Sequence, residues 1–145
     1  MGKRVKLVLQ TFVITLTYLF PNGLSAQETP KKPECWAITN VKGFSAQSDE
    51  NYSFAQDGIK STMLLCFEDN SGTVTGTDTK LMRFGGSTLA GLVQKGGLEL
   101  FEVYQIDRIK NKLLYGKSRV GTKTVYPFVP DIISSFVGDA KQVSK

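Results

Sequence analysis

The sequence predicts a mainly β protein: a single antiparallel meander of about seven strands that forms a small barrel or sandwich, with one disulfide and a short C-terminal helix. Three observations predict this class. Short runs rich in β-branched and aromatic residues alternate with Gly, Asn and Asp turn signals at close spacing. The regular alternation of strands with long helices that accompanies a parallel sheet is missing. The chain also contains one even pair of cysteines.

Residues 1–26 have the three parts of a cleavable secretory signal peptide. They comprise a basic start (3–6), an uncharged stretch of fourteen residues (7–20), and small residues before an expected cleavage after Ser25 or Ala26. An uncleaved anchor is the alternative, but a spanning helix needs about 20 apolar residues, and this stretch is shorter and contains polar side chains. We therefore expect a periplasmic or secreted protein with no stable transmembrane anchor after cleavage.

The chain is less basic than its total charge suggests. It holds 18 basic and 13 acidic residues, a formal charge of +5. Removal of the signal peptide takes away Lys3, Arg4 and Lys6, so the mature charge is 15 minus 13, or +2. Nucleic-acid-binding domains usually show a clear basic footprint, so we expect no nucleic-acid partner.

Cys35 and Cys66 are the only cysteines, and in an oxidising compartment they predict a disulfide. A catalytic thiol is the alternative, but it needs a nearby base, and the chain has no histidine. Residues 27–34 contain two prolines and no apolar anchor, which predicts a flexible tether. The folded β-rich domain should then cover 35–140, and residues 141–145 should form a C-terminal tail.

Seven strands are expected, at 35–42, 59–68, 73–84, 87–94, 98–106, 112–120 and 122–129. In the third of them, threonines alternate over 73–79 and predict one exposed polar face. After the last strand, a helix is predicted from Pro130-Asp131, Ile132, Ile133, Phe136, Val137 and Gly138. Since this helix has only about two turns, it should dock on the sheet or across an open end of the barrel.

The strand predicted at 98–106 carries apolar groups on both faces. The first face is formed by Leu98, Leu100, Tyr104 and Ile106. Phe101 and Val103 lie on the other face. This pattern predicts a central strand that the domain covers on both sides. The alternative is that Phe101 and Val103 contact the terminal helix or a partner.

The predicted hairpin over 98–120 holds much of the positive charge. Strand alternation places Leu113, Tyr115, Lys117 and Arg119 on one face and Lys112 on the other. The Lys117/Arg119 pair is therefore a candidate contact for a carboxylate, a phosphate or an anionic polymer. The alternative is a solvated outer face whose charges discourage aggregation.

Three aromatic residues are further candidates for a ligand site. Tyr104 and Tyr115 could line a pocket. Trp36, next to Cys35, could line the floor of a cavity or could instead anchor one end of the barrel by packing.

No catalytic or metal-binding constellation stands out. The lack of histidine removes the usual base of serine and cysteine hydrolases, and zinc would need the two cysteines that are expected to form a disulfide. Two carboxylates among Glu99, Glu102 and Asp107 could support glycoside chemistry, but the pattern selects no pair. We expect no cofactor and no metal, and favour a protein that is not an enzyme.

The layout resembles that of small exported barrels, among them lipocalin-like ligand carriers and periplasmic lysozyme inhibitors. This resemblance is architectural, so it transfers no residue role. The sequence predicts an exported binding domain whose loops and basic 108–123 hairpin contact an anionic small molecule, an envelope polymer or a protein. The alternatives are a lipocalin-like carrier of an apolar ligand and a carboxylate-dependent hydrolase. The oligomeric state is not predicted.

Overall fold

Antiparallel strands make up most of residues 32–121 and 126–144, which are the residues that the computed structural model describes. The strands are β1 (Glu34–Gln47), β2 (Phe54–Ile59), β3 (Met63–Phe67), β4 (Ser71–Val74), β5 (Leu81–Phe84), β6 (Thr88–Lys95), β7 (Leu98–Asp107), β8 (Lys112–Val120) and β9 (Ile132–Ser144), and a 3-10 turn, η1 (Ser48–Glu50), follows β1. This confirms the mainly β, antiparallel class. In this part of the chain, no helix has the length and apolarity needed to cross a bilayer.

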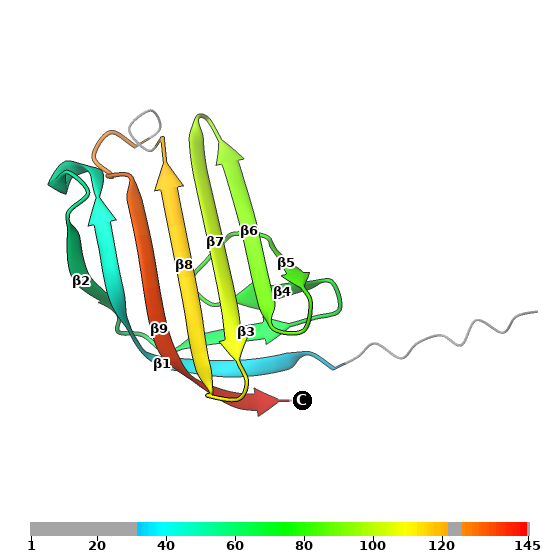
Figure 1. The fold of residues 1–145 in the computed structure, drawn as a ribbon. Coiled ribbons are helices and arrows are strands. Elements are labelled where there is room, and N and C mark those ends of the chain that lie inside the picture. Colours follow the sequence, from blue (N-terminus) through cyan, green and yellow to red (C-terminus); the bar gives the residue numbers. More distant parts are fainter. Residues whose placement is uncertain (1–31, 122–125, 145) are drawn as a thin grey trace, which may run out of the picture.

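Eight strands close into a barrel in the order β1-β3-β4-β5-β6-β7-β8-β9, with β9 pairing back onto β1. The extra strand, β2, pairs with the second half of β1. The long strands β6 to β9 stand side by side, and the short strands β3, β4 and β5 complete the barrel near its lower end (Figure 1). The structure therefore selects the barrel over the sandwich.

β1 has two different neighbours along one of its edges. Residues 34–38 pair with β3 and residues 41–46 pair with β2, while β9 follows the other edge. A register shift between Thr39 and Lys42 separates the two halves. At the start of the strand, Cys35 lies directly opposite Cys66 of β3, and the two form the predicted disulfide.

The apolar core fills the half of the barrel next to the turn at 108–111. All eight barrel strands contribute side chains to it, and burial of each Val, Leu, Ile, Phe or Met among them typically stabilises a fold by about 1.5–3 kcal/mol. The core consists of Trp36, Ile38, Val41, Met63, Leu65, Phe67, Val74, Leu81, Leu89, Tyr104, Ile106, Leu113, Tyr115, Phe136 and Ala140.

The predicted C-terminal helix is wrong, because this segment forms β9, which closes the barrel between β8 and β1. Along β9, Ser134, Phe136 and Ala140 are buried, whereas Ile133 and Val137 are about half exposed. The apolar pairs Ile132/Ile133 and Phe136/Val137 lie four residues apart, as apolar residues on one face of a helix do. β-branched residues nevertheless favour strands, and here both edges of the segment find a hydrogen-bonding partner.

The strand predicted at 73–84 is in fact two strands, β4 and β5, because Gly76 turns the chain with a φ of +88°. The connection between them passes close to Gly91 of β6, where an added Cβ would lie 2.6 Å from Thr79 Cγ2. Thr77 and Thr79 consequently bond to a side chain inside the barrel. The expectation that all four threonines share one exposed face is therefore wrong.

The second half of the strand predicted at 122–129 is not a strand. Residues 126–129 form a turn, which is closed by a hydrogen bond of 3.0 Å from Val129 N to Tyr126 O. Residues 122–125 lie outside the described part of the chain, as do the predicted signal peptide and most of the predicted tether.

β2 was not predicted, because its sequence FAQDGI lacks a regular alternation of apolar and polar residues.

The outer side of β7 is not covered as expected. Phe101 is 45% exposed, so no described part of the domain buries it. The prediction of a central strand covered on both sides is therefore wrong. Only the inner side of β7 belongs to the core.

Candidate functional site

Three rows of inward-facing residues cross the barrel, each contributed in turn by β6, β7, β8, β9 and β1. Residues that are directly opposed in neighbouring antiparallel strands share a face, so the ladder register defines the rows. The tyrosine row is Leu89, Tyr104, Tyr115, Phe136 and Gly43. The charged row is Gly91, Glu102, Lys117, Ser134 and Ser45. The arginine row is Val93, Leu100, Arg119, Ile132 and Gln47.

The tyrosine row forms the upper layer of the core. The rings of Tyr104 and Tyr115 are stacked with their centroids 4.5 Å apart, and Phe136 continues the stack 5.5 Å from Tyr115. Gly43 leaves room for Phe136, because an added Cβ would lie 2.9 Å from Cδ1 of that ring. Packed aromatic side chains therefore separate the lower core from the two rows above it.

The centre of the charged row is the Glu102 carboxylate, which is only 2% exposed. Its Oε2 accepts hydrogen bonds from Thr77 Oγ1 and Thr79 Oγ1, both at 2.6 Å. Its Oε1 accepts a hydrogen bond of 3.0 Å from Tyr115 OH and lies 3.5 Å from Lys117 Nζ. Four donors thus satisfy this buried acid, as a buried charge requires.

The electrostatics keep Glu102 ionised and its tyrosine neighbours protonated. Burial by itself would raise the pKa of Glu102, but the hydrogen bonds from Thr77 and Thr79, the charge of Lys117 and the hydroxyl of Tyr115 together lower it. Burial raises the pKa of both Tyr104 and Tyr115, and the Glu102 charge raises each further. At neutral pH, Glu102 therefore carries a negative charge and the two tyrosines are neutral.

Arg119, in the next row, is the less satisfied cation. Its Nη2 donates a hydrogen bond of 3.0 Å to the carbonyl oxygen of Pro130. Its Nε is buried and has no hydrogen-bond partner. Among the described residues, no carboxylate forms an ion pair with it. Its opposed neighbours, Leu100 and Ile132, are apolar and half-buried.

The ladder places the basic hairpin as strand alternation predicts. Leu113, Tyr115, Lys117 and Arg119 share one face, while Lys112 lies on the other face and pairs with Asp139. The shared face is the barrel interior, so it is not a solvated outer face. Tyr104, Tyr115 and Lys117 meet around Glu102, and Arg119 lies one row further along β8.

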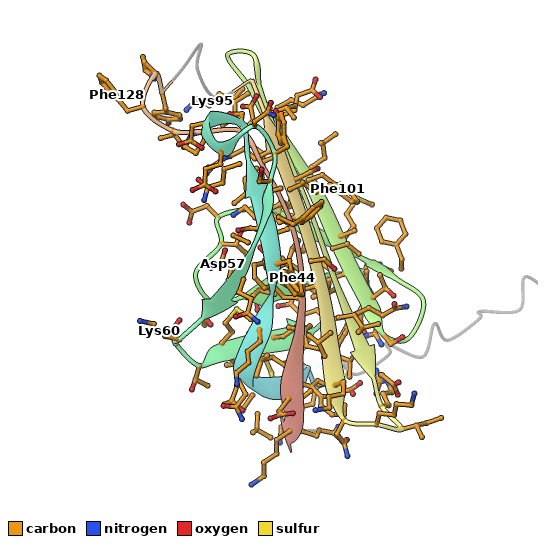
Figure 2. All side chains as sticks on the ribbon, turned by 60° about the vertical axis from the view of Figure 1, so that its left-hand side comes forward. Phe44, Asp57, Lys60, Lys95, Phe101 and Phe128 are labelled. Carbon is orange, nitrogen blue, oxygen red and sulfur yellow. A yellow bond between two sulfur atoms is a disulfide. The ribbon has the colours of Figure 1, made fainter. Side chains whose placement is uncertain are left out.

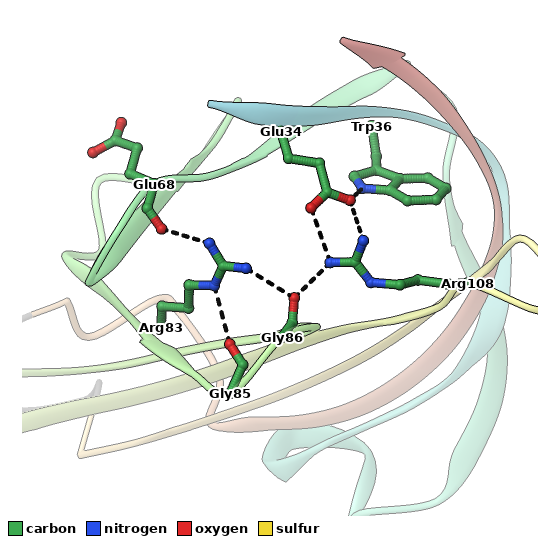
Figure 3. A network of polar contacts seen from close by, with 7 residues as sticks. All are labelled: Glu34, Trp36, Glu68, Arg83, Gly85, Gly86 and Arg108. Carbon is green, nitrogen blue, oxygen red and sulfur yellow. Dashed lines mark hydrogen bonds and ion pairs between the residues drawn. The ribbon is translucent and has the colours of Figure 1, made fainter. Parts of the chain in front are cut away.

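Trp36 lies at the other end of the barrel, in a separate network around Arg83 and Arg108 (Figure 3). Its Nε1 donates to Glu34 Oε1 at 2.9 Å, and Arg108 pairs with the same carboxylate. The Arg108 guanidinium also lies 5.8 Å from the Trp36 ring centroid. Trp36 is 3% exposed and packs at this end of the barrel as part of the apolar core.

The three carboxylates considered for hydrolysis do not face one another. Glu102 points inward, while Glu99 and Asp107 lie at odd-numbered positions of the same strand and point outward. Asp107 Oδ1 accepts hydrogen bonds from the backbone amides of Ile109 and Lys110, which orders the turn. Among the described residues, no group of three or more acidic, cysteine or histidine side chains could hold a metal.

An open groove with a volume of about 590 Å³ lies beside the β1–β2 pair. Asp57 and Lys60, labelled in Figure 2, are among its lining residues, as is Lys42. Its charged lining residues are exposed and of mixed sign. We place the candidate site in the barrel interior instead, because there the charged groups are held in fixed positions.

Comparison with family models, with curated proteins and with solved structures finds no match for this chain. The site must therefore be interpreted from its own geometry. In that geometry, four donors surround the Glu102 carboxylate, and two cations, Lys117 and Arg119, face the barrel interior.

Sequence reasoning missed the roles of Glu102, Thr77 and Thr79 at this site. The signal for Glu102 was present: pairing Asp107 with Lys112 across the predicted turn places Glu102 directly opposite Lys117. The break at Gly76 had a local signal, because an isolated glycine in a strand pattern often marks a bulge or a turn. No such signal showed that Thr77 and Thr79 reach Glu102, because that contact depends on tertiary packing.

Proposed function

We propose that the protein is a periplasmic or secreted binding domain for a small organic anion with an apolar body, held in the upper half of the barrel by Arg119 and Lys117. The Cys35–Cys66 disulfide supports a location outside the cytoplasm, since such bonds persist in oxidising compartments. The observation that carries the proposal is the buried, unpaired Nε of Arg119.

Charge balance inside the barrel supports an anionic ligand. The charged and arginine rows contain two cations and one carboxylate, and Glu102 is already engaged by Lys117 and three hydroxyl groups. Among the described residues, one positive charge on this face therefore lacks a counterion. A carboxylate, sulfonate or phosphate could accept hydrogen bonds from Arg119 in the bidentate geometry that guanidinium groups favour.

The residues around Arg119 support an apolar body for that ligand. Val93, Leu100 and Ile132 belong to the same row and are half-buried. They offer apolar surface beside the cation, as ligand sites usually do. Lys117, with 29% of its side chain exposed, could provide a second contact for the anionic group.

Fluorescence titration with 8-anilinonaphthalene-1-sulfonate, an aromatic sulfonate, tests this proposal. We expect Arg119→Ala to raise the Kd about 10-fold or more, because hydrogen bonds to charged groups contribute about 1.5–3 kcal/mol. Lys117→Ala should have a smaller effect in the same direction. Binding should weaken with added salt, but less than at an open surface.

Lys110→Ala is the matched control. It removes the same charge from the exposed turn of the same hairpin, so the Kd should change less than about twofold. Equal affinities for the Arg119→Ala and Lys110→Ala variants would remove the proposal, and so would the lack of any saturable binding.

A further inference from the structure

The proposed ligand site holds a fixed negative charge beside its two cations. Glu102 and Lys117 are directly opposed, and Arg119 follows Lys117 on the same inward face, two positions further along β8. A strand rises about 3.3 Å per residue, so the row of Arg119 lies about 7 Å from the row of Glu102. That spacing is within the Debye length of about 8 Å at physiological ionic strength. The carboxylate therefore acts electrostatically on any anion that Arg119 binds.

Glu102 cannot turn away from such an anion without losing its own partners. Thr77 and Thr79 donate to its Oε2, while Tyr115 and Lys117 hold its Oε1. The donors therefore come from two sides of the carboxylate, the β4–β5 connection and β8. The side chain is also only 2% exposed, so dissolved salt screens its charge less than it would at the surface.

Of the residues that define the charged and arginine rows, three carry a charge. Lys117 and Arg119 each contribute one positive charge, and Glu102 contributes one negative charge. In the layer below, burial raises the pKa of Tyr104 and of Tyr115, so both hydroxyl groups are neutral at neutral pH. The net charge of the two rows is therefore +1, from two cations minus one carboxylate. A ligand with one negative charge balances it, whereas a second negative charge would be buried without a counterion, which is unfavourable.

We propose that Glu102 determines specificity at this site and makes it select singly charged amphiphiles over doubly charged ones. This selectivity rests on the proposed function, since it concerns the anion that Arg119 would bind there. Alkyl sulfates, sulfonates and carboxylates carry one charge at neutral pH, whereas a phosphate monoester carries close to two. A site rejects the wrong ligand through a repulsive contact as well as through lost attraction, and Glu102 is the repulsive contact here. Lys117 is already paired with Glu102, so it cannot balance a second ligand charge.

Isothermal titration calorimetry with decyl sulfate and decyl phosphate tests this selectivity in the wild-type protein. The two ligands share one alkyl chain and a tetrahedral head group, but the phosphate ester loses a second proton with a pKa of about 6. From about pH 5 to about pH 8, we expect the Kd of decyl phosphate to rise about 10-fold or more and that of decyl sulfate to change less than about twofold. The chain has no histidine, the side chain that would titrate in this range, so the charge change occurs mainly on the ligand.

Glu102→Gln tests whether this residue is the cause of the selectivity. An amide keeps an oxygen that can accept the hydrogen bonds of Thr77 and Thr79, but it removes the negative charge. At about pH 8, we expect decyl phosphate to gain at least about 10-fold in affinity relative to decyl sulfate, because Lys117 is then free to bind the second charge. Glu99→Gln is the matched control, since it removes an exposed acid from the outer side of the same strand and should leave the ratio unchanged.

The wild-type comparison decides even if Glu102→Gln folds poorly, because it needs no variant. A Kd of decyl phosphate that stays constant or falls over this pH range would overturn the selectivity, while saturable binding of decyl sulfate would still support the proposed site. An unchanged ratio of the two affinities in folded Glu102→Gln would overturn the role of this residue. If decyl sulfate does not bind at either pH, the proposed function fails and the selectivity fails with it.

Discussion

Glu102 on β7 and Lys117 on β8 occupy directly opposed positions inside the barrel, with 3.5 Å between Oε1 and Nζ. The same carboxylate accepts hydrogen bonds from the β4–β5 connection through Thr77 and Thr79. One buried acid therefore joins three parts of the fold. Glu102 also neutralises the charge of Lys117, whereas Arg119 has no counterion among the described residues.

Replacing Glu102 should destabilise the fold strongly. In Glu102→Leu, Thr77, Thr79, Tyr115 and Lys117 all lose their shared acceptor. We expect a loss of about 3 kcal/mol in the free energy of unfolding, the lower end for breaking a buried pair, because Lys117 keeps partial access to solvent. Urea denaturation followed by the fluorescence of Trp36, the only tryptophan in the chain, measures this change. The exposed Glu99→Leu should cost no more than about 0.5 kcal/mol, and equal losses in both variants would contradict this role of Glu102.

Stability should depend on Glu102 in acid. The folded-state pKa of this group is lowered, so its contribution is fully present above its unfolded pKa of about 4.3 and is lost as the pH falls through the folded value. The stability difference between wild type and Glu102→Gln should stay constant from pH 7 to about 5 and shrink below about pH 4. Urea denaturation at each pH gives this difference, and a gap that is the same at pH 3 and pH 7 would contradict it.

Gly43 should tolerate no side chain. An added Cβ would lie 1.9 Å from the backbone oxygen of Ser135 and 2.8 Å from Phe136 Cα, so the β1–β9 ladder would have to move. We expect Gly43→Ala to cost at least about 1–3 kcal/mol, the usual range for overpacking. Gly86→Ala is the control, because nothing lies within 4 Å of its added Cβ. The midpoint of thermal unfolding should fall in Gly43→Ala and stay near the wild-type value in Gly86→Ala. A wild-type midpoint for Gly43→Ala would contradict this prediction, because the β1–β9 ladder would then have adapted to the added Cβ.

The disulfide should contribute substantially to stability. It closes a loop with a sequence separation of 31 residues. On the chain-entropy model, such a loop gives about 3–4 kcal/mol. The double variant Cys35→Ala/Cys66→Ala should therefore unfold at a lower urea concentration than wild type, and wild type in reducing buffer should behave like the variant. Unchanged midpoints in both cases would assign the stability of the fold to packing alone.

Parts of this structure could be predicted from the sequence because they depend on local rules. Strand alternation correctly separated Lys112 from Lys117 and Arg119, and the even cysteine pair predicted the bond between β1 and β3. Alternation could not decide that Lys117 and Arg119 face inward. Charged residues usually lie outside, and it takes the buried Glu102 to make the interior acceptable for Lys117.

β9 was missed for a related physical reason. A half-buried strand normally hides its apolar residues, but β9 places Ser134 inside and Ile133 outside. This inverted pattern follows from a polar row within the barrel and an apolar outer face, which are both tertiary features. Without them, the apolar pairs of this segment fit a helix better than a strand.

The most direct test of the proposed binding site is the Arg119 Nε–H resonance, observed by 1H–15N NMR and assigned through its loss in Arg119→Lys. The group has no hydrogen-bond partner in the described part of the chain, so an anion that binds there should change its environment more than that of any other arginine. During titration with decanoate, a carboxylate with an alkyl chain, we expect a saturable shift of this resonance and slower exchange of its proton with water. An Arg119 resonance that stays unchanged while the protein binds decanoate, or no binding of decanoate at all, would contradict the account.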